Sequence, residues 1–155
     1  MIRVGHGYDL HRLQTGGKLL MGGIVVADGI SPIAHSDGDV VMHAIVDALL
    51  GAAGLGDIGE HFPDSDPKWK NAASSLFIEH TIHELKQKGW KAVNADVTIL
   101  AERPRLKQFK AQMQQKLREL LQCDVNIKAG TNEGCDAVGR GEAVAAHAVV
   151  LIQRS

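Results

Sequence analysis

Strand-like and helix-like patterns of apolar residues alternate along this chain, and this alternation constrains the fold more than any other feature. The segments that read as strands are residues 2–10, 18–26, 93–100 and 124–129. Residues 143–152 could be a helix or a buried strand, and the apolar run Val149 to Ile152 favours a strand. Helical patterns lie between them, and the chain closes on two successive strands. We therefore expect an α+β fold, with one domain over residues 1–155. The prediction is a sandwich in which helices cover one face of a mixed, mainly antiparallel four-stranded sheet.

The first two strand segments read as a hairpin. Gly16-Gly17 is the predicted turn, and Gly22-Gly23 then breaks the second arm as a bulge or bend. A loop rich in Gly, Ser, Pro and Asp follows over residues 28–37.

The first helix is predicted to begin near Gly38, with Ser36 as its N-cap and Asp39 completing an acidic capping box. Its buried stripe recurs at helical spacing and consists of Val40, Val41, Ala44, Ile45, Ala48 and Leu49. Asp39, His43 and Asp47 repeat every four residues on the opposite face. A second helix is expected over residues 74–88, and Pro104 is expected to open a third.

Composition excludes several functional classes. The formal net charge is -1 and no stretch concentrates Lys and Arg, so we expect no nucleic-acid partner. No apolar run reaches the roughly 18 residues that cross a bilayer, and no signal-peptide pattern is seen, so we expect a cytoplasmic protein with no membrane contact. Two cysteines, Cys123 and Cys135, are expected to be plain thiols.

The most informative polar pattern is Asp9-x-His11, at the end of the first strand segment. Residues two apart on a strand project from the same face, so the carboxylate and the imidazole can converge. His43 is the natural third ligand, and three protein ligands with an open position are typical of catalytic zinc. Asp39 or Asp47 could then hold the His43 ring. The alternative is that these histidines are surface or packing residues.

Two further segments could bind phosphate or a hard cation. His35-Ser36 lies just before the first helix, where free backbone amides attract phosphate, although Ser36 could merely cap that helix. Residues 128–133 leave a strand with a hydroxyl, Thr131, and a carboxylate, Glu133, which suit Mg²⁺ or Mn²⁺.

Taken together and in this order, the motifs resemble the 2-C-methyl-D-erythritol 2,4-cyclodiphosphate synthases of the non-mevalonate isoprenoid pathway. The resemblance covers nearly the whole chain. Its motifs are Arg3 to His11, the block from Ala34 to Ala53, Gly56-Asp57-Ile58-Gly59 and Phe62 to Pro67.

The resemblance implies a homotrimeric lyase with active sites between subunits. Its expected substrate is the cytidine diphosphate compound 4-diphosphocytidyl-2-C-methyl-D-erythritol 2-phosphate. The 2-phosphate attacks the β-phosphorus, which gives the cyclic diphosphate and CMP. The resemblance also implies Zn²⁺ on Asp9, His11 and His43, with Mg²⁺ or Mn²⁺ at Glu133.

The same resemblance assigns roles to further residues. His35 and Thr131 would stabilise the transition state, and Ser36 would contact phosphate. The remaining substrate contacts would be Asp57, Ile58, Gly59, Phe62, Pro63, Asp64, Ser65 and Asp66 around the erythritol, then Ala101, Pro104, Arg105, Leu106, Gly130, Asn132 and Arg140 at or near the nucleotide.

The chain departs from the family pattern at Gly130 and Asn132, where threonines are usual. These changes leave a rival interpretation, an inactive zinc-stabilised trimeric binding module. A second rival is a metal-dependent phosphohydrolase on the same scaffold, which would yield a linear product.

Overall fold

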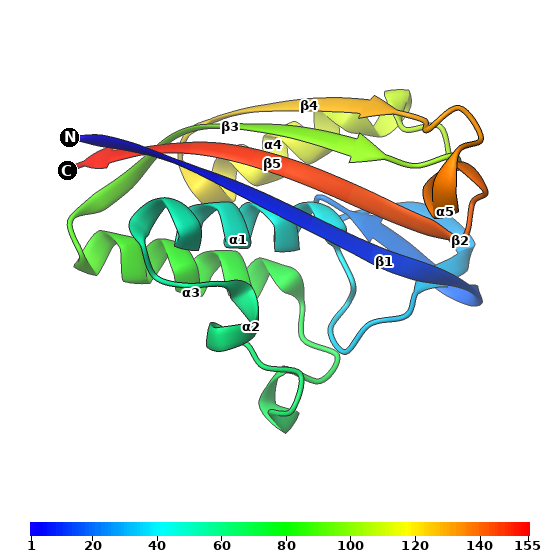
Figure 1. The fold of residues 1–155 in the computed structure, drawn as a ribbon, viewed down its shortest axis with the longest axis horizontal. Coiled ribbons are helices and arrows are strands. Elements are labelled where there is room, and N and C mark those ends of the chain that lie inside the picture. Colours follow the sequence, from blue (N-terminus) through cyan, green and yellow to red (C-terminus); the bar gives the residue numbers. More distant parts are fainter.

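A computed structural model describes residues 1–155 as a sheet with helices packed against it (Figure 1). In chain order the elements are β1 Ile2–Met21, β2 Ile24–Pro32, α1 Val40–Ala53, α2 Ile58–His61, η1 Pro67–Trp69, α3 Ser74–Gln87, β3 Trp90–Leu100, η2 Lys107–Phe109, α4 Lys110–Leu121, β4 Asp124–Gly130, α5 Asp136–Gly139 and β5 Ala143–Arg154. The predicted α+β class is confirmed. No helix is long and apolar enough to cross a membrane.

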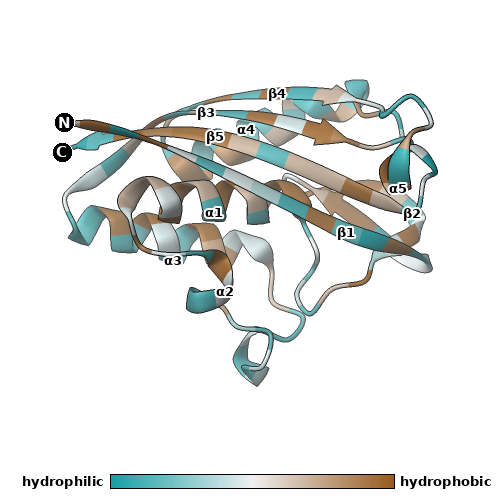
Figure 2. Ribbon diagram, in the orientation of Figure 1, coloured by the Kyte–Doolittle hydropathy of each residue, from teal (hydrophilic) through white to brown (hydrophobic).

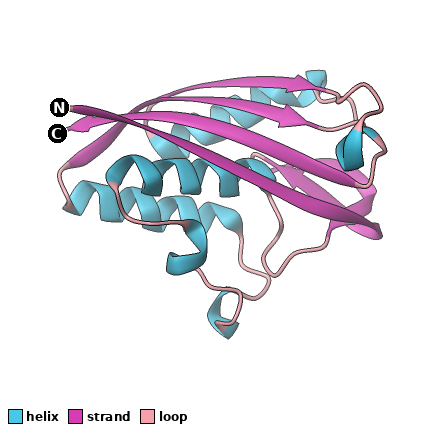
Figure 3. Cartoon of the chain, in the orientation of Figure 1, coloured by secondary structure: helices cyan, strands magenta, loops and turns pink.

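The sheet has five strands in the order β2-β1-β5-β3-β4, so the prediction of four strands is wrong. The second arm of the hairpin, β2, is the fifth strand. Only the β3–β4 pair is parallel, which confirms a mixed, mainly antiparallel sheet. The long helices α1, α3 and α4 lie on one side of the sheet (Figure 3).

The hairpin turns at Gly22-Gly23, whereas the sequence predicted a turn at Gly16-Gly17. Met21 pairs with Ile24, and both intervening glycines have positive φ, as a tight two-residue hairpin turn requires. Gly16 and Gly17 instead lie within β1, where the register against β2 shifts between Thr15 and Lys18. Both glycine pairs suit a turn locally, and tertiary contacts select between them.

Helix α1 is the centre of the core because it is covered on both sides. The six residues of its predicted apolar stripe are all buried. The helix packs against β1 and β5 on one side and α3 on the other, and both α1 and β5 are mainly hydrophobic in Figure 2. Gly5 and Gly7 of β1 face Ala48 and Ala44 of this helix. Their missing side chains allow the helix backbone to approach the sheet closely.

The N-cap of α1 is Asp39 and not Ser36. The Asp39 carboxylate accepts hydrogen bonds from the backbone N–H groups of Val41 and Met42, each at 3.1 Å. It also accepts from Gly22 at 3.0 Å and Gly23 at 2.7 Å, and the residue is fully buried. One side chain therefore caps the helix and anchors the hairpin turn.

Replacing Asp39 with alanine is expected to destabilise the fold by about 3 kcal/mol, because a cap and the partners of two further N–H groups are lost together. Urea unfolding followed by circular dichroism measures this change. Asp124→Ala, which alters a highly exposed carboxylate, is the matched control and should stay within about 0.5 kcal/mol of the parent. Equal unfolding free energies for the two variants would contradict the assigned role of Asp39.

The third long helix begins later than predicted. Pro104 lies in the loop after β3, and α4 starts at Lys110 after the short turn η2. Met113, Leu117 and Leu121 are buried along its inner side at helical spacing. Strand β5 confirms that segment 143–152 is a strand. Both cysteines are free thiols.

Candidate metal centre and active site

Strand β1 and helix α1 together position three groups that could hold a metal ion. Asp9 and His11 are two apart on β1 and share the face that looks toward α1, as do Gly5 and Gly7. His43 lies one turn into α1, beside them. The Asp9 carboxylate Oδ2 is 2.9 Å from His11 Nε2 and 3.0 Å from His43 Nδ1, and the two ring nitrogens are 3.2 Å apart. The three donors converge on one point.

The donor set fits a zinc ion. Zinc is bound tetrahedrally at about 2.0–2.1 Å by nitrogen and oxygen, which separates neighbouring donor atoms by roughly 3.3 Å. The measured separations lie close to that value. Two imidazole nitrogens and one carboxylate oxygen also match the ligand types of catalytic zinc sites, which leave a position open.

The charges around the three groups favour an ionised Asp9. Burial by itself would raise the pKa of Asp9, but the hydrogen bonds and charges of His11 and His43 outweigh it and hold that pKa well below its usual range. Burial would lower the pKa of His43, whereas its hydrogen bond to Asp9 and the nearby carboxylates raise it overall. A side chain has to be deprotonated before it can bind zinc. The Asp9 carboxylate is already ionised, whereas the His43 imidazole still has to lose a proton.

The other ring nitrogen of His43 contacts two hydroxyl groups and no carboxylate. His43 Nε2 is 2.9 Å from Ser74 Oγ at the start of α3 and 3.1 Å from Ser36 Oγ. The predicted role of Asp39 and Asp47 as holders of this ring is therefore wrong. Asp39 is committed to the hairpin turn, and the Asp47 carboxylate accepts from Ile58 N at 3.0 Å. Sequence reasoning missed Ser74, which is 31 residues from His43 and carries no local signal.

A pocket of about 410 Å³ opens over these three candidate ligands. Ten residues that the sequence predicted for the site line this pocket, namely Asp9, His11, His35, Ser36, His43, Ile58, Gly59, Phe62, Pro63 and Asp64. Four residues that were not predicted also line it, namely Ile33, Ala34, Trp69 and Phe77. Phe62 stacks on Phe77 with ring centroids 4.5 Å apart, which forms an apolar wall. A single cavity thus contains the three candidate metal ligands, the pair His35-Ser36 that is predicted to contact phosphate, and an apolar wall of Phe62 and Phe77.

Three predicted residues lie beside this pocket and not on its surface. The Asp57 carboxylate caps α2 by accepting from Glu60 N at 3.0 Å. The Asp66 carboxylate caps η1 by accepting from Lys68 N at 2.9 Å, and Ser65 is exposed between these turns. Their roles as substrate contacts stay predictions.

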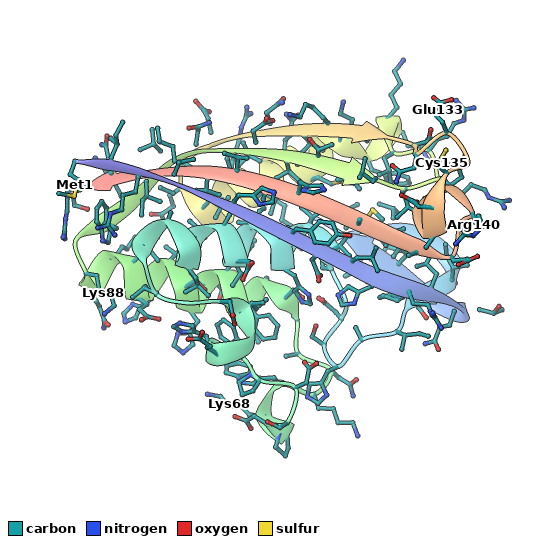
Figure 4. The ribbon with its side chains drawn as sticks, viewed as in Figure 1. Met1, Lys68, Lys88, Glu133, Cys135 and Arg140 are labelled. Atoms are coloured by element: carbon teal, nitrogen blue, oxygen red, sulfur yellow. The ribbon has the colours of Figure 1, made fainter.

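The other predicted residues form a second group at the far ends of β3 and β4. The two strands are parallel and end together, so the loops after them adjoin; Ala101 N donates to Gly130 O at 3.1 Å. Pro104 and Arg105 line a separate hollow, while Leu106 is buried. Thr131, Glu133 and Arg140 are exposed, and Asn132 donates to Asp136. Figure 4 shows Glu133 and Arg140 at the end of the molecule that carries α5. Within one chain, none of this group lines the pocket of Asp9.

Comparisons with known proteins agree with one another. The YgbB family profile matches residues 2–153. A 2-C-methyl-D-erythritol 2,4-cyclodiphosphate synthase of Desulfosudis oleivorans is 51% identical over 154 residues, which cover 97% of this chain and 92% of that protein. A solved synthase of this name in a CDP-bound form superposes with a TM-score of 0.90 at 36% identity, covering 97% of this chain and 100% of that one. The bifunctional IspDF of Campylobacter jejuni superposes at 0.96 and 37% identity over 100% of this chain, which spans 43% of that longer protein.

Proposed function

Because the chain belongs to the YgbB family of 2-C-methyl-D-erythritol 2,4-cyclodiphosphate synthases, we propose that it closes the ring of the cyclic diphosphate by a metal-assisted intramolecular phosphoryl transfer. Membership makes the protein an enzyme of the phosphorus–oxygen lyase class. The observation that supports this reaction best is the convergence of Asp9, His11 and His43 in a pocket that also holds His35 and Ser36.

In the proposed reaction an oxygen of the substrate's 2-phosphate bonds to the β-phosphorus. The bond from that phosphorus to the oxygen bridging it to the α-phosphorus breaks, so the products are the cyclic diphosphate and CMP. No water enters. Such a transfer needs mainly alignment and the neutralisation of charge, because both reacting groups are anionic.

Zn²⁺ held by Asp9, His11 and His43 would polarise a phosphate oxygen, and Mg²⁺ or Mn²⁺ held by Glu133 would offset the diphosphate charge. The chain itself orients the substrate. His35 and Ser36 line the same pocket as the donors and can donate hydrogen bonds to phosphate, while Ile58 and Gly59 also line it and would contact the erythritol hydroxyls. Asp57 and the segment Phe62–Asp66 complete that side of the proposed site.

A homotrimer with active sites between subunits accounts for the separation of the two residue groups. His35 belongs to the pocket, whereas Thr131 and Glu133 lie outside it in the same chain. A neighbouring copy would bring its nucleotide-binding residues to this pocket, namely Ala101, Pro104, Arg105, Leu106, Gly130, Thr131, Asn132, Glu133 and Arg140. The sheet face opposite the helices supports association, because it exposes Ile2, Val4, Tyr8, Leu10 and Val149.

The decisive test is to incubate the purified protein with the cytidyl substrate and Mg²⁺, with and without a zinc chelator, and to follow phosphorus NMR. We expect a cyclic diphosphate and CMP, both suppressed by the chelator. A linear diphosphate product would favour the phosphohydrolase. No CMP under either condition would favour the inactive binding module, whose one supporting feature is the altered Gly130-Thr131-Asn132 segment.

The predictions of one domain over 1–155 and of a cytoplasmic location stay predictions.

A further inference from the structure

Three side chains from separate parts of the chain are linked in series behind the metal-binding groups. Asp37 lies in the loop before α1, Ser74 is the first residue of α3, and His43 is in α1. The Ser74 hydroxyl donates to Asp37 Oδ1, and Ser74 Oγ lies 2.9 Å from His43 Nε2. Ser74 is fully buried, so bulk water does not compete for its hydroxyl. The series ends at His43 Nδ1, which faces Asp9.

The direction of each hydrogen bond follows from the donors available. A hydroxyl has one proton, and an ionised carboxylate can only accept. The proton of Ser74 is therefore committed to Asp37, and Ser74 Oγ can only accept from His43. His43 must then carry a proton on Nε2, so Nδ1, which faces Asp9 and His11, is the ring nitrogen that has to give up its proton to bind a metal.

The same reasoning leaves a free donor in the pocket. Ser36 Oγ accepts from Gly38 N at 3.3 Å and lies 3.1 Å from His43 Nε2, which has only one proton to share. The Ser36 hydroxyl proton has no acceptor in this set of contacts, and Ser36 lines the pocket. Once Ser74 holds the ring of His43, the Ser36 hydroxyl can turn toward a phosphate oxygen.

We propose that Asp37 and Ser74 are positioning residues that fix the tautomer and orientation of His43 and so tune its affinity for the metal. The proposal rests on the proposed function, because it concerns the same metal centre. Asp37 and Ser74 would act through His43 and would contact neither the substrate nor the metal. Partners of this kind around histidine ligands typically change metal affinity by roughly 10- to 100-fold.

A purely structural role has to be separated from this one. The second oxygen of Asp37 accepts from the backbone N–H of Ser74 at 2.9 Å and so caps α3. Ser74→Ala removes the hydroxyl but keeps this backbone bond. The variant therefore interrupts the link to His43 while the start of α3 retains its cap.

The test measures zinc affinity without substrate, by competition with a chromophoric chelator. We expect Ser74→Ala to bind zinc roughly 10- to 100-fold more weakly, and Ser74→Thr, which restores a hydroxyl, to recover much of the loss. Thr81→Val is the matched control: Thr81 is a buried hydroxyl of the same helix that donates only to Phe77 O at 2.7 Å. Its zinc affinity should equal that of the parent.

Nitrogen-15 NMR of the zinc-loaded protein provides a second readout, the exchange rate of the proton on His43 Nε2. We expect a slowly exchanging proton on His43 Nε2, and faster exchange of that proton in Ser74→Ala. Unchanged zinc affinity in Ser74→Ala, or zinc bound through Nε2 in the parent, would overturn the proposal. Neither measurement uses turnover, so the result does not depend on whether the cyclic diphosphate is formed.

Discussion

His43→Ala is expected to lose bound zinc and at least about a thousandfold of kcat/KM for release of CMP. One of three converging donors disappears, and Asp9 and His11 are left with a cavity where the third ligand stood. Loss of a Lewis acid costs several kcal/mol of transition-state stabilisation, and each 1.36 kcal/mol is a factor of ten in rate. Zinc content by mass spectrometry and CMP release by chromatography measure the two effects on the same sample.

The matched control is His83→Ala. His83 is exposed on α3, and its ring contacts only the side chain of Gln87, at 2.9 Å. Its zinc content and rate should equal those of the parent. Sedimentation should show the same oligomer for the parent and both variants, because His43 does not lie on the exposed face of the sheet. A His43→Ala protein that is fully active without zinc would refute the proposed metal centre.

Gly7→Ala is expected to produce the largest loss of stability, about 3 kcal/mol or more. A Cβ on Gly7 would lie 1.9 Å from the carbonyl oxygen of Ala44 and 2.7 Å from the backbone nitrogen of Ala48. These are backbone atoms of α1, so no rotamer change relieves the overlap. The helix would have to move away from β1, which would open the core and shift His43 from Asp9. Thermal and urea unfolding measure the loss.

Gly51→Ala is the control for this substitution. Gly51 lies near the end of α1, and a Cβ there meets no atom within 4 Å. Alanine is favoured over glycine inside a helix by about 1 kcal/mol, so this variant should be as stable as the parent or more stable. If Gly7→Ala unfolded within 0.5 kcal/mol of the parent, the close approach of β1 to α1 would be refuted.

The spacing of residues within single segments predicted most of the helices and strands, and it predicted that Asp9 and His11 lie together in the site. The apolar stripe from Val40 to Leu49 repeats at helical spacing and is buried as expected. Asp9 and His11 share a face because side chains alternate along any strand. The polar face of the first helix made His43 the candidate third ligand, and the family resemblance supported that assignment, but only the packing of α1 on β1 brings its ring to Asp9 and His11.

Two of the wrong predictions concern choices between locally equivalent residues. Gly16-Gly17 and Gly22-Gly23 are equally good turn formers, and Ser36 and Asp39 are equally good helix caps. Asp39 decides both questions at once, because its buried carboxylate binds the N–H groups of Gly22 and Gly23 together with those of α1. No pattern within either segment records that long-range contact.

The sequence by itself determined the class of fold, the face of β1 that carries Asp9 and His11, and the apolar side of α1, because these depend only on the repeats of strand and helix. Tertiary structure alone decided the five-stranded order, the turn at Gly22-Gly23 and the contact of His43 with Ser74. The strand order and the His43–Ser74 contact join residues far apart in the chain, and the turn is held by Asp39, which is 17 residues from Gly22. Their energies come from backbone donors and buried hydroxyls that must find partners once water is excluded, and the packed fold determines which partners lie within reach.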